Sequence, residues 1–130
     1  MNLVVDASIA IEVLLQTQLG QRAMAALQPA ALYAPELLDV EVVAVLRREV
    51  LGGRLDATRA GEAVEDLRDW DIERVGHRRL LADAWRLRNN ATAYDAQYLA
   101  VARQYNATII TADGPLSRIP LAGFTIQNLR

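Results

Sequence analysis

Short apolar runs alternate with longer segments of helical periodicity along the chain. The runs at 2–5 and 107–113 predict strands buried on both faces, and 31–35 predicts a further short strand. Residues 71–75 alternate in polarity as a strand, and 124–129 predicts a last strand at a sheet edge. Apolar spacing of three and four residues predicts helices between the strands. The expected helices span 8–16, 18–28, 36–51, 56–70, 77–88 and 92–105, and a turn is expected at 114–115.

Strands that alternate with helices predict an α/β protein with a mainly parallel sheet and helices on both faces. A chain of 130 residues, of which 52% are hydrophobic and 23% charged, is expected to form one domain. In such sheets, ligands bind beyond the carboxyl ends of the strands. The residues that follow the strands are therefore the first place to look for a site.

Composition narrows the chemistry that such a site can perform. The chain has no cysteine, its only histidine is His77, and all fourteen basic residues are arginines. Disulfides, thiolate metal sites and reactions that need a lysine are excluded. No apolar run approaches the ~20 residues that span a bilayer, and an intracellular protein is expected. The net charge of −2 does not by itself indicate a nucleic-acid-binding protein.

Four carboxylates stand at strand ends or on apolar helix faces. Asp6 ends the first strand and Asp113 ends the strand at 107–113, so both should emerge at the same edge of the sheet. Asp95 lies in the first turn of its helix on a largely apolar face. Glu41 lies inside the long helix among leucine, valine and alanine residues. An ionised carboxylate in apolar surroundings is costly unless it is paired or bound to a metal.

Three of these acids also have an ordinary structural explanation. Asp6 or Ser8 fits as the cap of the first helix. Thr92 and Asp95 fit a capping box, and Asp113 before Gly-Pro fits a turn. These alternatives remain open for each residue taken alone.

Taken together, the four acids favour a shared metal site. Carboxylates gathered in one cleft repel one another, and a hard divalent cation such as Mg²⁺ or Mn²⁺ relieves that repulsion. Such a cation activates water and stabilises charge on a phosphoryl group. Metal-assisted phosphodiester hydrolysis is therefore the chemistry that this composition supports best. Asp39 remains a rival to Glu41, because the long helix is apolar nearly all round.

Four segments in order resemble the PIN-domain ribonucleases, most closely the VapC-type toxins of bacterial toxin–antitoxin pairs. They are VVDAS (4–8), PELLDVEVVAVLRR (35–48), TAYDAQYLAVA (92–102) and TIITAD (108–113). The resemblance covers essentially the whole chain. It implies one PIN domain over residues 1–130, folded as a three-layer sandwich with about five mainly parallel strands.

The resemblance also implies roles for particular residues. The acidic quartet that binds Mg²⁺ or Mn²⁺ and supports catalysis would be Asp6, Glu41, Asp95 and Asp113. Asp6 and Asp95 are expected to contact the metal directly, and the other two directly or through water. Ser8 and Thr111 match hydroxyl residues that support the site, and Glu41 is favoured over Asp39. The segment GPLSR (114–118) lacks a further acid that some relatives carry.

The implied function is a cytoplasmic, metal-dependent endoribonuclease toxin that inhibits translation by cutting tRNA, rRNA or mRNA. Its implied partners are a second copy of itself and a cognate VapB-type antitoxin, in a heterotetramer or larger assembly. The apolar helix at 36–51 independently favours a second chain. A catalytically inactive PIN scaffold that binds RNA or protein is the alternative. A receiver domain would need a lysine, and an aspartyl-phosphate phosphatase usually carries Asp where this chain has Ser8.

An acidic pocket needs cations beside it to hold RNA. Arg86 and Arg88, just before the TAYD segment, are the candidates for substrate binding, with a solvated helix face as the alternative. Four aromatic residues at helical spacing predict the core or a dimer interface rather than base stacking: Trp85, Tyr94, Tyr98 and Tyr105. His77 is expected in a surface turn with no catalytic role.

Overall fold

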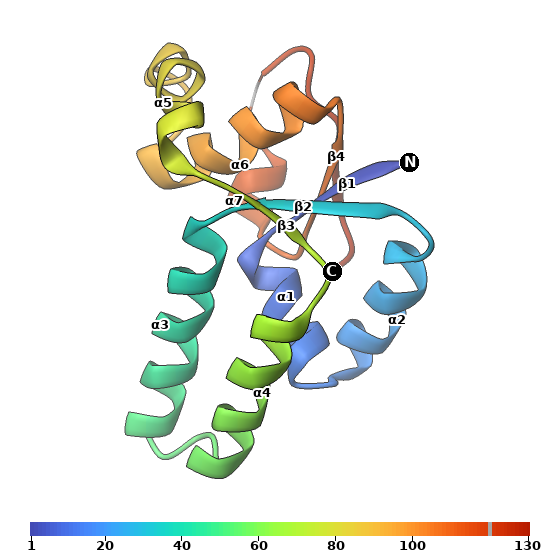
Figure 1. Ribbon diagram of the computed structural model, residues 1–130, viewed down its shortest axis with the longest axis vertical. Helices are drawn as coiled ribbons and strands as arrows, with labels where there is room; N and C mark the ends of the chain where they lie inside the picture. The colour runs from blue at the N-terminus through green and yellow to red at the C-terminus, as the bar shows by residue number, and fades with distance from the viewer. Residues whose placement is uncertain (120) are drawn as a thin grey trace.

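The computed structural model describes residues 1–119 and 121–130 and is built on a five-stranded parallel sheet in the order β3-β2-β1-β4-β5 (Figure 1). The strands are β1 (Asn2–Val5), β2 (Ala31–Pro35), β3 (Glu73–Val75), β4 (Thr108–Thr111) and β5 (Ile126–Asn128). The helices are α1 (Ala7–Leu14), α2 (Gln18–Leu27), α3 (Leu37–Leu51), α4 (Ala57–Asp69), α5 (His77–Arg86), α6 (Ala93–Tyr105) and α7 (Gly114–Ser117).

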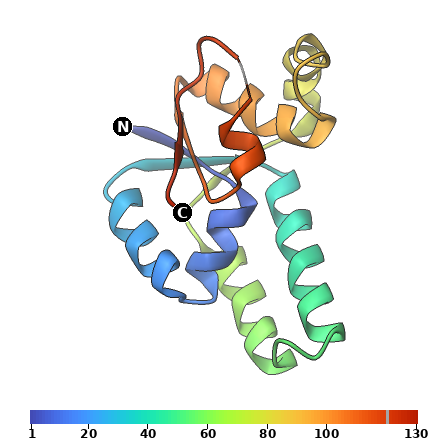
Figure 2. The ribbon, with the colours of Figure 1, turned by 180° about the vertical axis from the view of Figure 1, so that it is seen from behind.

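The sheet separates two layers of helices, each with its own core. Helices α1 to α4 cover one face and α5 to α7 the other (Figures 1 and 2). In the central strand β1, Leu3 and Val5 belong to the first core and Val4 to the second, all at most 3% exposed. The alternation of side chains along a strand explains why such a strand is apolar throughout.

The predicted α/β fold, with a parallel sheet and helices on both faces, is confirmed. Strand β5 lies at one edge beside β4, as expected for the last strand, and β3 forms the other edge. Several element bounds differ from the prediction by one or two residues, and one element differs in kind. Gly114 and Pro115, expected as a turn, begin the short helix α7, with Pro115 in its first turn where a missing N–H costs nothing. The helix expected at 77–88 ends at Arg86.

Side-chain caps fix the starts of several helices. Thr17 accepts a hydrogen bond from the Gly20 N–H at 3.0 Å, and Asp56 accepts one from the Arg59 N–H at 3.1 Å. Helices α1 and α2 meet at Gly20 of α2, where a Cβ atom would overlap the Glu12 carbonyl of α1. The close approach of the two helices therefore requires glycine. Within the described part of the chain, no helix is both long and apolar enough to cross a membrane.

Candidate active site

The site begins where the two central strands end. Asp6 directly follows β1, and its N–H donates to the Ile110 carbonyl of β4 at 3.1 Å, which continues the ladder by one residue. Its carbonyl oxygen accepts hydrogen bonds from Ile9 and Ala10, which starts α1. The carboxylate makes no capping hydrogen bond and is only 7% exposed. The helix-cap explanation therefore holds for the position of Asp6 but does not account for its side chain.

Two hydroxyls hold the Asp6 carboxylate. Ser8 and Thr111 both donate to Oδ2 of Asp6, at 2.6 Å and 2.8 Å. The backbone N–H of Ala112 donates to Ser8 Oγ, and that of Asp113 donates to Thr111 Oγ1. Burial raises the pKa of Asp6, and the two hydroxyl hydrogen bonds only partly oppose that rise.

In α3, the structure separates the two acids that the periodicity left as rivals. Asp39 pairs with Arg74 of β3, with 3.0 Å between Nη2 and Oδ1. Glu41 lies within electrostatic range of Asp6 and Asp95, and its Oε1 accepts a hydrogen bond from the Tyr98 hydroxyl at 2.6 Å. Burial, and then the charges of those two aspartates, raise the pKa of Glu41.

Asp95 joins this group from the start of α6. Its backbone N–H donates to Thr92 Oγ1 at 3.0 Å, so the predicted helix cap is present. The half-exposed carboxylate faces the other acids: burial first, and then the charges of Asp6 and Asp113, raise the pKa of Asp95. Capping and a place in the site are therefore compatible at this position.

Tyr98 is the site residue that sequence analysis missed. It is 1% exposed, and burial and the hydrogen bond to Glu41 raise the pKa of its phenol well above the usual range, so it remains a donor. Its place three residues after Asp95 puts both on one side of α6, which is a signal in the sequence. The hydrogen bond to Glu41 joins residues 57 positions apart, and no pattern in the sequence indicates it.

The donor set fits a hard divalent cation. The four acids offer carboxylate oxygens, which Mg²⁺ and Mn²⁺ prefer, and the charge repulsion that helps to raise the pKa values of Glu41 and Asp95 is what a cation relieves. Within the described part of the chain, no three His, Cys, Asp or Glu side chains lie close enough together to hold a metal ion. The carboxylates would have to draw together around one.

The candidate substrate residues lie outside this group. Arg86 pairs with Asp83, with 2.7 Å between Nη1 and Oδ1, and the Arg88 guanidinium lies 4.7 Å from the centre of the Trp85 ring. His77 is exposed, as predicted, although it begins α5 rather than lying in a turn; its Nδ1 lies 3.3 Å from Oε1 of Gln97. Phosphate contacts by Arg86 and Arg88 stay a prediction.

The four aromatic residues divide into two pairs. Tyr98 is buried, and Tyr105 stacks on Tyr33 with 4.1 Å between ring centres, so the prediction of core positions is confirmed for these two. Trp85 and Tyr94 are 68% and 63% exposed and do not belong to the core.

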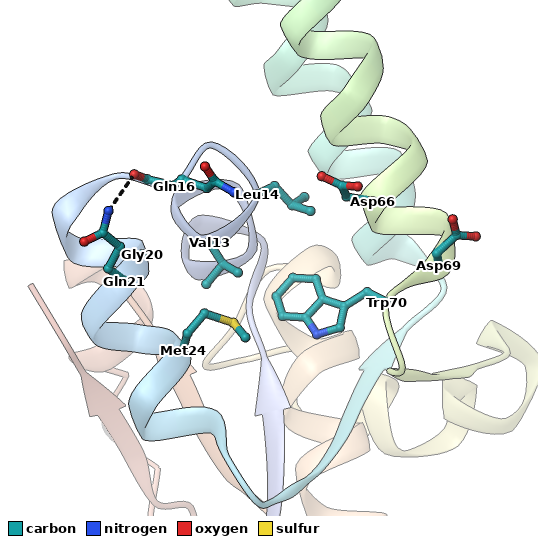
Figure 3. Close-up of a pocket in the computed structure, with 9 residues that line it drawn as sticks. All are labelled: Val13, Leu14, Gln16, Gly20, Gln21, Met24, Asp66, Asp69 and Trp70. Carbon is teal, nitrogen blue, oxygen red and sulfur yellow. Dashed lines mark hydrogen bonds between the residues drawn. The ribbon is translucent and has the colours of Figure 1, made fainter.

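A separate hollow lies on the face of the sheet covered by α1 to α4, between α1, α2 and α4 (Figure 3). Its volume is about 560 Å³. Val13, Met24 and the ring of Trp70 form apolar walls, and Asp66 and Asp69 stand on its rim (Figure 3). None of the four acids lines it, so this hollow is distinct from the acidic site.

Comparison with known proteins is consistent with this arrangement. The PIN domain family model matches residues 3–121. A VapC ribonuclease of Mycobacterium bovis is 36% identical over 115 residues, which cover 88% of each chain. Ribonuclease VapC3 of Mycobacterium tuberculosis is 34% identical over 118 residues, which cover 90% of this chain and 86% of that one.

Solved structures share the fold at lower identity. VapBC2 from Rickettsia felis, bound to a DNA fragment from its promoter, matches with a TM-score of 0.70 and 13% identity over 98% of each chain. VapC20 of Mycobacterium tuberculosis, described as a toxin that cleaves the sarcin-ricin loop, matches with a TM-score of 0.68 and 20% identity over 95% of this chain and 96% of that one.

Proposed function

Because this chain belongs to the PIN-domain family, among its VapC ribonucleases, we propose that it is an endoribonuclease toxin that hydrolyses RNA phosphodiester bonds with Mg²⁺ as cofactor. PIN-domain VapC ribonucleases generally depend on a divalent metal. The RNA would be tRNA, rRNA or mRNA, so that cleavage inhibits translation. Residues 1–130 would act as one catalytic domain.

One observation carries this proposal: Asp6, Glu41 and Asp95 come from three separate elements, yet each has a raised pKa, and charges within the quartet contribute for Glu41 and Asp95. Like charges are gathered in this way at functional sites more often than in structural cores. The ordinary alternatives, caps and turns, do not require the acids to converge.

The quartet would hold the cation, which supplies Lewis-acid activation of water and neutralises charge on the phosphate. The hydroxyls of Ser8 and Thr111 fix Oδ2 of Asp6, so Oδ1 would be the oxygen that contacts the cation. Tyr98 fixes Oε1 of Glu41 in the same way. A carboxylate with a raised pKa accepts a proton more readily near neutral pH, which suits Glu41 to take the proton of the attacking water.

The direct test is cleavage of RNA by the purified protein. We expect cleavage in the presence of Mg²⁺, loss of cleavage on addition of EDTA, and recovery when Mg²⁺ is restored in excess. Mg²⁺ should also raise the Tm, because binding to the folded state stabilises it. Binding of RNA without turnover at any Mg²⁺ or Mn²⁺ concentration would instead favour the inactive scaffold.

Tyr98→Phe tests the role of the hydrogen bond to Glu41. The bond lowers the pKa of Glu41, so its loss should raise that pKa further. Since the ionised carboxylate would be the active form, the acid limb of the pH–rate profile should move to higher pH. Activity near neutral pH should fall several-fold and recover as the pH rises.

Tyr105→Phe is the matched control for this variant. Tyr105 stacks on Tyr33 and its hydroxyl is not part of the acidic site, so its pH–rate profile should coincide with that of the parent. An unchanged acid limb in Tyr98→Phe would remove Glu41 from the proton-transfer step.

A VapB-type antitoxin is the proposed protein partner, since similar folds are found in VapBC complexes. The hollow between α1, α2 and α4 offers it apolar walls with an acidic rim. An antitoxin segment with apolar side chains and flanking basic residues would complement both features. The acidic site would stay open or be covered depending on how the rest of the antitoxin continues.

A homodimer is proposed through α3 and α4. Val40, Val43 and Leu51 of α3 are 66%, 45% and 69% exposed, and Val64 of α4 is 39% exposed. The sequence predicted that one sheet could not bury all of this helix. Apolar residues gathered on neighbouring helices mark a surface that a second copy would cover.

A further inference from the structure

The corner formed by α5, the start of α6 and the turn between them carries exposed aromatic side chains next to the acidic site. This α5–α6 corner comprises residues 77–94 and lies on the face of the sheet opposite α3 and α4 (Figure 1). Tyr94, in the first turn of α6, directly precedes Asp95. Trp85, in the last turn of α5, is capped on one side by the Arg88 guanidinium. The two exposed rings, one of them directly before an acid of the quartet, make this corner a candidate contact surface.

Charge sets the same corner apart. Residues 77–94 contain four arginines and one aspartate, a net charge of +3, in a chain whose net charge is −2. The remaining residues therefore carry −5. All four arginines of the corner are exposed: Arg78, Arg79, Arg86 and Arg88. The corner is thus a basic surface on an otherwise acidic molecule. Its last residue, Tyr94, directly precedes Asp95 of the quartet.

A second copy of the chain is a poor occupant for this surface. A two-fold interface places the same patch of both copies face to face, so two surfaces of +3 would meet. The apolar residues of α3 and α4 offer a dimer surface without that repulsion. A polyanion with flat apolar rings satisfies both properties of the corner at once, and RNA is such a polymer.

We propose that Tyr94 and Trp85 are specificity-determining residues that stack unpaired RNA bases on the strand leading to the cleavage site, while the arginines of the corner contact its phosphates. The inference rests on the proposed ribonuclease function. Tyr94 takes a base next to the scissile phosphate, and Trp85 one further along the strand. The Arg88 guanidinium covers one face of the Trp85 ring and leaves the other face for a base. Bases in a duplex are already stacked on their neighbours, so the site selects loops and single strands.

The experiment compares initial rates on two RNAs: a hairpin with an eight-nucleotide unpaired loop, and the same RNA annealed to its complement. The parent should cut the loop and leave the duplex intact. Trp85→Ala and Tyr94→Ala should each raise KM for the loop about tenfold, the usual size of one stacking contact, with kcat within about twofold. Trp85→Phe and Tyr94→Phe should return KM to near the parent value. Leu81→Ala, at another exposed apolar residue of α5, is the control and should change neither constant.

The possible results distinguish failure of the stacking role from failure of the proposed ribonuclease function. A parent that cuts neither RNA in Mg²⁺ or Mn²⁺ overturns the ribonuclease function. If the parent cuts the loop and both alanine variants keep its KM, the stacking role alone is overturned. Cleavage of the duplex by the parent as fast as the loop overturns it as well. Failure of the phenylalanine variants to restore KM argues against stacking. A change in molecular mass by light scattering in either alanine variant assigns these residues to an interface between chains.

Discussion

Asp95→Asn should lower the rate of RNA cleavage by about 10²–10³-fold in the purified protein, a loss typical of removing one electrostatic group from a reaction centre. The substitution keeps the size of the side chain and the Thr92 cap, because the cap uses the backbone N–H of residue 95. It removes a negative charge that the proposed quartet would need to hold a cation. Initial rates at saturating Mg²⁺ on an RNA that the parent cuts give the measurement.

The same variant should be more stable than the parent when no metal is present. The pKa of Asp95 is raised, by burial first and by the charges of Asp6 and Asp113, so its ionised form costs folding free energy at neutral pH. That cost is absent at low pH, where the carboxyl is protonated, and develops as the pH rises through the raised pKa. After allowing for solvent at this half-exposed site, about 0.5–1 kcal/mol is relieved, which is a Tm rise of about 2–4 °C.

Asp71→Asn is the matched control, because Asp71 is an exposed acid between α4 and β3. It should change neither the rate nor the Tm. Cleavage by Asp95→Asn at the parent rate would disprove the place of Asp95 in the quartet. The same comparison with Asp6→Asn tests the acid at the end of β1.

Thr111→Val should lower cleavage about 10–100-fold, the usual effect of removing a residue that orients a metal ligand. Thr111 is fully buried, and its hydroxyl donates to Asp6 and accepts from the Asp113 N–H, both at 2.8 Å. Valine has nearly the same shape, so packing is kept while both bonds are lost. The pKa of Asp6 should rise further, since the hydrogen bond from Thr111 lowers it.

The buried groups left without partners should also lower the free energy of unfolding by about 1–3 kcal/mol. Thr111→Ser retains the hydroxyl and should keep most of the activity, which separates the hydrogen bond from the loss of a methyl group. Equal activity in the valine and serine variants would show that the hydroxyl does not position Asp6. Denaturant unfolding gives the change in stability.

The elements of the fold were predictable because each has a distinct local pattern. Val4 and Val5 face opposite cores, so the strand is apolar from Leu3 to Val5. The turn expected at Gly114 was wrong for a local reason as well: proline suits the first turn of a helix as readily as a turn. These segments depend on neighbours a few positions away, which a sequence displays directly.

The contacts within the site depend on residues far apart in the chain. Periodicity could not choose between Asp39 and Glu41 on a helix that is apolar nearly all round. Arg74 engages Asp39 and leaves Glu41 as the proposed member of the quartet, but that contact spans 35 positions. Helical spacing also does not reveal which face of α5 is left uncovered, so it could not choose between the core and an interface for Trp85.

Because β1 pairs with β4, the site is completed late in the synthesis of the chain. The hydrogen bond between Asp6 and Thr111 joins residues 105 positions apart, and contacts of such separation form slowly. A growing chain that stops short of β4 has the first acid and Ser8, but it lacks Thr111, the second hydroxyl that holds this acid, and it lacks the last acid. In a protein proposed to cut the RNA of the cell that makes it, the active site therefore cannot form during translation until the chain is nearly complete.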